Sequence, residues 1–156
     1  MPLGVSTARS KKVVFFFPAF SSQEATAPLG ILAVATPLLR AGYQVKIIDS
    51  TITPNFQRRV MEELNDALCL AVSLVTGPMI RETCAVAREV KRLYPNMPIV
   101  LGGWHPSLLP DQTLAADFVD AVVVGIHWGQ EYEAEADAEQ IDLAKQIGAV
   151  ILKDSG

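Results

Sequence analysis

Residues 68–103, LCLAVSLVTGPMIRETCAVAREVKRLYPNMPIVLGG, contain one complete strand–helix–strand pattern. Residues 68–75 are apolar except for Ser73, as expected for a parallel strand that is buried on both faces. Across residues 79–94 the apolar positions recur every three or four residues, which predicts an amphipathic helix. A second apolar run, residues 98–101, then ends at two glycines. The pattern predicts two parallel strands joined by a right-handed helical crossover.

The same alternation continues on both sides of this unit. It predicts further strands at residues 13–17, 44–49 and 120–125, and further helices at 28–41 and 54–66. Pro37 lies inside the first of these helices and predicts a kink or an early break there. The fold class is therefore predicted as α/β: a doubly wound, flavodoxin-like (Rossmann-like) five-stranded parallel sheet with helices on both faces.

The chain is expected to form one domain. Residues 1–11 carry no pattern and are predicted as a flexible leader, and residues 12–156 as a single domain. Within it, residues 126–156 are predicted as a divergent C-terminal part, with a helix at 138–147 and a candidate extra strand at 148–151.

Composition excludes several classes of protein. Of the 156 residues 50% are hydrophobic and 19% are charged, which disfavours intrinsic disorder. The formal net charge of −4 disfavours a nucleic-acid partner, because few cations are available to neutralise phosphates. The apolar runs are short and interrupted, so we expect no membrane partner and a cytoplasmic location. Cys69 and Cys84 have no Cys or His at metal-ligand spacing and are expected to be reduced thiols.

The loops after the strands carry the candidate binding residues, because doubly wound sheets bind ligands at the carboxyl ends of their strands. Ser73 and Thr76 end the third strand and can hydrogen-bond a planar ligand, although capping of the next helix explains them equally well. Gly102 and Gly103 follow the fourth strand and let the backbone approach a bulky ligand. We expect Gly103→Val to obstruct that approach and to leave the fold largely intact.

An aromatic ring and an imidazole follow these glycines. Trp104 and His105 lie at the expected rim of the site, although a lone histidine is more often a hydrogen-bonded loop residue. Two other ligand classes lack their signatures. Asp49 ends the second strand, as in dinucleotide-binding folds, but no G-x-G-x-x-G follows the first strand. A phosphate-accepting receiver domain would need an aspartate after the third strand, and none is present there.

Five segments form a more specific set, namely PLGIL (28–32), GYQV (42–45) leading to Asp49, VSLVT (72–76), IVLGGWHPS (99–107) and VDAVVVG (119–125). Together they resemble the N-terminal cobalamin (B12)-binding domain of B12-dependent radical SAM enzymes, over about residues 12–125. The resemblance implies a cobalamin across the C-terminal edge of the strands, with its nucleotide tail beside the third strand. The implied cofactor-binding residues are Ser73, Leu74, Thr76, Gly102, Gly103, Trp104, His105 and Gly125.

The resemblance also bears on the cobalt. Cobalamin-binding families that bind cobalt through a protein imidazole carry Asp-x-His-x-x-Gly, whereas residues 49–53 read DSTIT. We therefore expect a corrinoid held without a histidine ligand to cobalt from that loop, no protein metal ligand and no catalytic residue.

The expected role is a cobalamin-binding module without activity in isolation. Members of the family continue with Gly-Glu-Gly-Glu and a barrel that carries Cys-x-x-x-Cys-x-x-Cys. This sequence has neither, and its two cysteines are too few for an iron–sulfur cluster. The implied partner is a radical SAM catalytic domain in cis or in trans.

Two alternatives remain open. Residues 126–151 weakly resemble CapA-type capsule-synthesis metallophosphatases, which would make the chain a small metal-dependent phosphoesterase-like remnant using His127 and acids such as Glu131 and Glu133. The other alternative is a flavodoxin-like scaffold that retains no ligand function.

Overall fold

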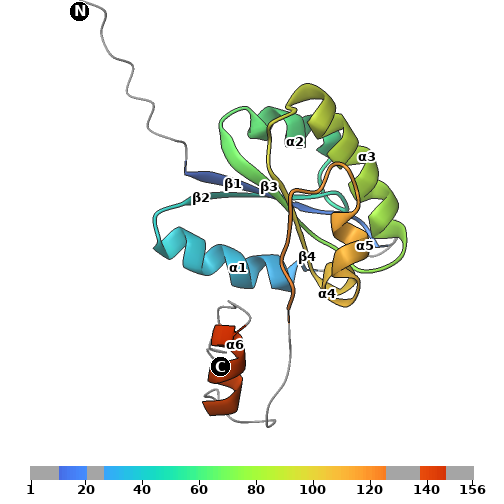
Figure 1. Ribbon diagram of the computed structural model, residues 1–156. Coiled ribbons are helices and arrows are strands. Elements are labelled where there is room, and N and C mark those ends of the chain that lie inside the picture. The colour runs from blue at the N-terminus through green and yellow to red at the C-terminus, as the bar shows by residue number, and fades with distance from the viewer. Residues whose placement is uncertain (1–10, 21–26, 126–137, 147–156) are drawn as a thin grey trace, which may run out of the picture. The chain divides into compact units, whose positions relative to one another are not determined.

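The strands form one parallel sheet in the order β2-β1-β3-β4-β5 in the computed structural model, which describes residues 11–20, 27–125 and 138–146 (Figure 1). The strand order is the flavodoxin-like one, so the predicted fold class is confirmed. The strands are β1 (Lys12–Phe17), β2 (Gln44–Asp49), β3 (Ala67–Ser73), β4 (Ile99–Gly102) and β5 (Ala121–Val122).

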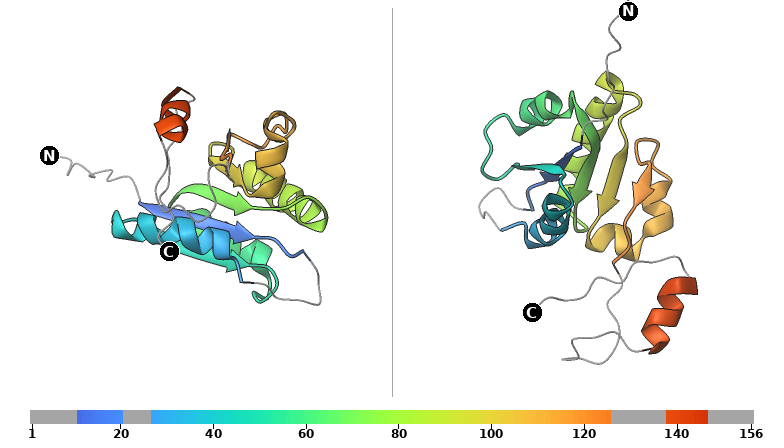
Figure 2. Two further views of the ribbon diagram at one scale, coloured as in Figure 1. Left: turned by 90° about the horizontal axis from the view of Figure 1, so that it is seen from below. Right: turned by 90° about the vertical axis from the view of Figure 1, so that its left-hand side faces the viewer.

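Helices cover the two faces of this sheet unequally. Helix α1 (Leu29–Arg40) packs on one face through Ile31, against Val13 and Phe15 of β1. Helices α2 (Phe56–Leu64) and α3 (Pro78–Leu93) pack on the other face, where a larger core contains Val14, Phe16, Leu70, Val72, Ile99 and Leu101. Seen from below, α1 runs along β1 and β2, and β3 stays visible beside it (Figure 2, left). The face that carries α1 is therefore the less covered one.

Two short helices that were not predicted from the sequence follow β4. Helix α4 (Trp104–Leu108) begins directly after Gly103, and α5 (Pro110–Leu114) begins at a proline, a residue favoured in the first helical turn. Each contains five residues, too few for a helical period to show in the sequence. A kink or an early break was expected at Pro37, and the early break does not occur, because α1 continues to Arg40. The proline costs only one backbone hydrogen bond, close to the helix end.

The C-terminal part forms a separate compact unit. The chain divides into Met1–Gly125 and Ile126–Gly156, and the second unit contains helix α6 (Ala138–Gln146). Residues 1–10 of the predicted leader (1–11) and the candidate extra strand (148–151) lie outside the described residues. No helix among residues 11–20, 27–125 and 138–146 is long and apolar enough to cross a membrane.

Asp120 has a structural role. Its Oδ2 accepts hydrogen bonds from the backbone N–H of Ile99 and from Lys91 Nζ, both at 2.7 Å. Although burial opposes ionisation, these two bonds hold the pKa of Asp120 below its usual value. Asp120 thereby joins the starts of β4 and β5 to α3, at the edge of the sheet opposite the strand ends.

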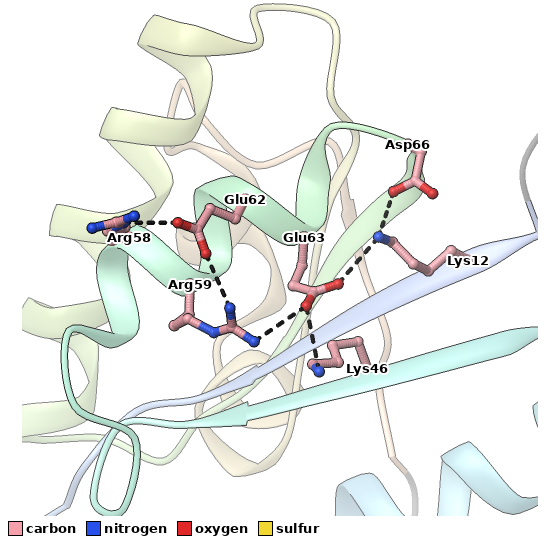
Figure 3. A network of polar contacts seen from close by, with 7 residues as sticks. All are labelled: Lys12, Lys46, Arg58, Arg59, Glu62, Glu63 and Asp66. Atoms are coloured by element: carbon pink, nitrogen blue, oxygen red, sulfur yellow. Dashed lines mark hydrogen bonds and ion pairs between the residues drawn. The ribbon is translucent and has the colours of Figure 1, made fainter.

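Charged residues at this same edge fasten α2 to the sheet (Figure 3). Glu63 of α2 lies 3.2 Å from Lys12 Nζ on β1 and 3.3 Å from Lys46 Nζ on β2. Its side chain is 21% exposed, so water screens these pairs less than it screens ordinary surface pairs. Asp66 also pairs with Lys12, while Arg58 and Arg59 pair with Glu62. Burial favours the neutral form of Glu63, but the two lysines prevail and lower its pKa.

We expect this network to weaken in acid. Because the pKa of Glu63 is lowered by folding, the unfolded chain binds more protons over the carboxyl titration range. The free energy of unfolding should therefore fall as the pH drops below about 5 and passes through the lowered pKa. Urea unfolding of the parent and of Glu63→Gln at several pH values tests this. The parent should be more stable by about 1 kcal/mol at pH 7, with the difference vanishing in acid. A difference independent of pH would contradict the assignment.

Candidate functional site

The strand order reverses between β1 and β3, and the candidate site lies at the carboxyl ends of these strands. From β1 the chain passes through α1 to β2 on one side, and from β3 through α3 to β4 on the other. The two connections diverge onto opposite faces of the sheet, and doubly wound sheets bind their ligands at this place.

Small residues form the sheet surface beside α1 at this edge. Ala71 and Ser73 of β3 pair with Val100 and Gly102 of β4, and all four are only half-buried. Their neighbours on the opposite face, Val72 and Leu101, are fully packed in the larger core. We call Ala71, Ser73, Val100 and Gly102, together with Gly30 of α1, the Ser73 surface.

Gly30 borders this surface on the side of α1. A Cβ atom built at Gly30 would lie 4.0 Å from Ser73 Oγ and would meet no other atom within 4 Å. Among the residues that the structure describes, the Ser73 hydroxyl has no hydrogen-bond partner. The Ser73 surface therefore presents a hydroxyl that no side chain at position 30 covers and that is available to a ligand.

Gly103 fills a different role from the one expected. It has a φ of +95°, and a Cβ atom there would lie 2.6 Å from the carbonyl oxygen and 2.9 Å from the nitrogen of Leu74. Leu74 N–H donates to Gly102 O at 3.0 Å, and His105 N–H donates to Leu74 O at 3.3 Å. The backbones after β3 and β4 thus touch at Gly103. The expectation that Gly103→Val leaves the fold largely intact is wrong, because any side chain collides with backbone.

The other predicted residues gather around this contact. Thr76 Oγ1 lies 3.0 Å from His105 Nδ1, which links the segments after β3 and β4 a second time. Trp104 is 75% exposed, and Leu108, one helical turn later, is 70% exposed, so α4 presents an apolar ridge. Gly125 N–H donates to Ser107 Oγ at 2.9 Å, which ties the segment after β5 to α4.

Leu74 differs from the other predicted residues. Its side chain is buried in the larger core, on the α3 side of the sheet, so only its backbone faces the site. Three members of the Ser73 surface, Gly30, Ala71 and Val100, were not among the residues predicted from the sequence. The period of two along β3 places Ala71 on the same face as Ser73 and could have identified it.

Candidate metal ligands do not cluster in the described part of the chain. No group of three or more His, Cys, Asp or Glu residues there is arranged to hold a metal ion. His127, Glu131 and Glu133, on which the phosphoesterase alternative depends, lie outside the described residues.

A doubly wound sheet with small residues at its switch point is typical of domains that bind a cofactor or another small molecule. Comparison with protein-family models then identifies the class of ligand. The model of the B12 binding domain matches residues 19–137, more than half of the chain. The chain belongs to the B12-binding domain family, and its cofactor is cobalamin.

Among solved structures, one similar chain is that of the radical S-adenosylmethionine methyltransferase TsrM from Kitasatospora setae, with tryptophan substrate and the SAM analogue aza-SAM bound. The TM-score is 0.55 and the sequence identity 21%, over 65% of this chain and 21% of that chain. The present chain thus matches about a fifth of that protein, and the likeness supports the fold. No curated protein matches the sequence. The resemblance of residues 126–151 to CapA-type metallophosphatases gains no support from these comparisons.

Proposed function

We propose that this chain holds cobalamin with the nucleotide tail on the Ser73 surface and the corrin ring over the carboxyl ends of the strands. The observation that carries the proposal is that no side chain at position 30 covers Ser73, although a Cβ atom there would lie within 4.0 Å of the Ser73 hydroxyl oxygen. The unpartnered Ser73 hydroxyl can bond a polar edge of the tail, and the small neighbouring residues let a planar base lie against the sheet.

The corrin ring would extend toward α4. Trp104 offers an aromatic face beside the two glycines, and Thr76, His105 and Gly125 come from the adjacent strand ends. The apolar ridge of α4 suits the hydrocarbon edge of a corrin, because burying it would remove a large exposed apolar area from water. Leu74 and Gly103 would form part of the wall of the site with their backbone atoms and would make no side-chain contact with the ligand.

The cobalt would have no histidine ligand from the protein. The sequence contains two histidines, His105 and His127, and neither has an aspartate two positions before it. The partner of His105 Nδ1 is the Thr76 hydroxyl and not an aspartate carboxylate. At the end of β2, Asp49 Oδ1 accepts hydrogen bonds from Thr51 N–H at 2.8 Å and from Thr51 Oγ1 at 2.6 Å. Asp49 is therefore engaged locally and does not orient an imidazole.

The proposed role is that of a carrier for a catalytic domain. A radical SAM domain, in the same polypeptide or in another, would use the corrinoid that this module presents. The structural likeness to a radical SAM methyltransferase and the absence of a Cys-x-x-x-Cys-x-x-Cys motif from this sequence support that division of labour. The cytoplasmic location expected from the composition stays a prediction.

Electron paramagnetic resonance of bound cob(II)alamin tests the proposed ligation. With the tail base on the Ser73 surface and no imidazole on cobalt, the spectrum should lack splitting from an axial nitrogen. Nitrogen splitting that disappears in His105→Ala or His127→Ala would establish a histidine ligand and contradict the proposal. Nitrogen splitting that persists in both variants would mean that the tail base itself is bound to cobalt, which contradicts the placement of the tail on the Ser73 surface.

A further inference from the structure

A carboxylate on α3 connects the ends of two strands. Glu82 Oε2 accepts a hydrogen bond from the backbone N–H of Ala19 at 2.7 Å and another from Ser50 Oγ at 2.7 Å. Ala19 lies two residues after β1, and Ser50 follows β2 directly. Ser50 N–H also donates to Phe17 O at 3.0 Å. One oxygen atom therefore joins the connections after β1 and β2 to the helix that follows β3.

Glu82 is not explained by ordinary ion pairing. It is half-buried, and within the described residues no cation pairs with it. Burying part of a carboxylate is costly unless strong donors compensate it, and the two short bonds to Oε2 provide that compensation. The other acids of α3 and α2 pair with arginines or lysines, such as Glu89 with Arg92.

The position of Ala19 determines where the next residue lies. Phe20 is exposed, and its Cε2 atom lies 3.8 Å from where a Cβ of Gly77 would be. Gly77 follows Thr76, which carries the hydrogen bond to His105. The start of the connection after β1 thus places an aromatic ring beside Gly77, at the proposed corrin surface.

We propose that Glu82 is a positioning residue of the cobalamin site. Its carboxylate holds Ala19 and Ser50, and thereby keeps Phe20 against Gly77 at the edge where the corrin binds. The inference rests on the proposed function for the ligand, and on the three hydrogen bonds and the position of Phe20 beside Gly77 for the geometry.

Three variants separate positioning from general stability. Glu82→Leu removes the acceptor and keeps similar bulk, whereas Glu82→Gln can present its carbonyl oxygen to both donors. Glu89→Leu, on the same helix, is the matched control. Titration with methylcobalamin measures the affinity of each variant. We expect Glu82→Leu to bind about tenfold more weakly than the parent or worse, which corresponds to the loss of one charged hydrogen bond. The dissociation constant of Glu82→Gln should lie within about threefold of that of the parent. The control should bind like the parent. Parent-like affinity in Glu82→Leu would overturn the positioning role.

Hydrogen exchange in the ligand-free protein gives an independent readout. The Ala19 amide should be protected in the parent and in Glu82→Gln, and should exchange faster in Glu82→Leu. Equal protection in all three variants would overturn the inference. If the parent takes up no methylcobalamin, the proposed function fails, and the exchange measurement alone decides whether Glu82 holds the start of the loop.

Discussion

Gly30→Leu is expected to weaken methylcobalamin binding by about 100-fold, equivalent to about 2.7 kcal/mol, without loss of stability. A leucine at this position would extend over Ser73 into the space assigned to the nucleotide tail. The fold should tolerate it, because Gly30 is helical, exposed and free of close neighbours. Replacing a helical glycine even favours the helix by as much as about 1 kcal/mol. Affinity and stability should therefore change in opposite directions, which a generally damaging substitution does not produce.

Ala33→Leu is the matched control for this substitution. Ala33 is an exposed residue of the same helix, three positions further on, so it receives the same side chain away from the helix start. Affinity is measured by titration and stability by urea unfolding for both variants and the parent. If Gly30→Leu binds like Ala33→Leu, the tail does not lie on the Ser73 surface.

Gly103→Ala should reduce the free energy of unfolding by about 3 kcal/mol or more. Two costs add at this position: the positive φ, which L-residues rarely adopt, and the collision of the Cβ with the Leu74 backbone. Gly42→Ala separates them. Gly42 has a φ of +81° and no atom within 4 Å of a built Cβ, so that variant should lose only about 1 kcal/mol.

Urea unfolding of both glycine variants measures the difference. A loss for Gly103→Ala no larger than that for Gly42→Ala would mean that the Leu74 contact relaxes easily. The result also affects how the Gly-Gly pair is understood. Gly102 borders the proposed tail position. Gly103 instead allows the backbone segments after β3 and β4 to touch, and would affect the shape of the site without contacting the ligand through a side chain.

The long elements could be predicted from the sequence, because continuous apolar runs and helical periods are local signals. The bounds of β2 agree with the prediction, and those of α3 differ by one residue at each end. Strand β5 is shorter than predicted, since only Ala121 and Val122 pair with β4. The apolar residues that follow, Val123 and Val124, are exposed, so their hydrophobicity did not indicate burial in the sheet.

The site was less predictable, because its members meet only in three dimensions. Ser73 and Gly102 could be identified as strand-end residues, and the register places them side by side. Gly30 comes from a helix that begins more than forty residues before Ser73, and nothing local marks it as a neighbour. Glu82 resembled any acid on the polar face of a helix, and its two donors come from other loops.

The most direct test of the whole account is equilibrium dialysis of this chain against methylcobalamin. After removal of free ligand, the protein should keep one equivalent of the corrinoid and its visible absorption spectrum, and Gly30→Leu dialysed in parallel should keep far less. A parent protein that comes out of dialysis colourless while remaining folded would contradict the central claim, that the surface around Ser73 in this chain is a working cobalamin site.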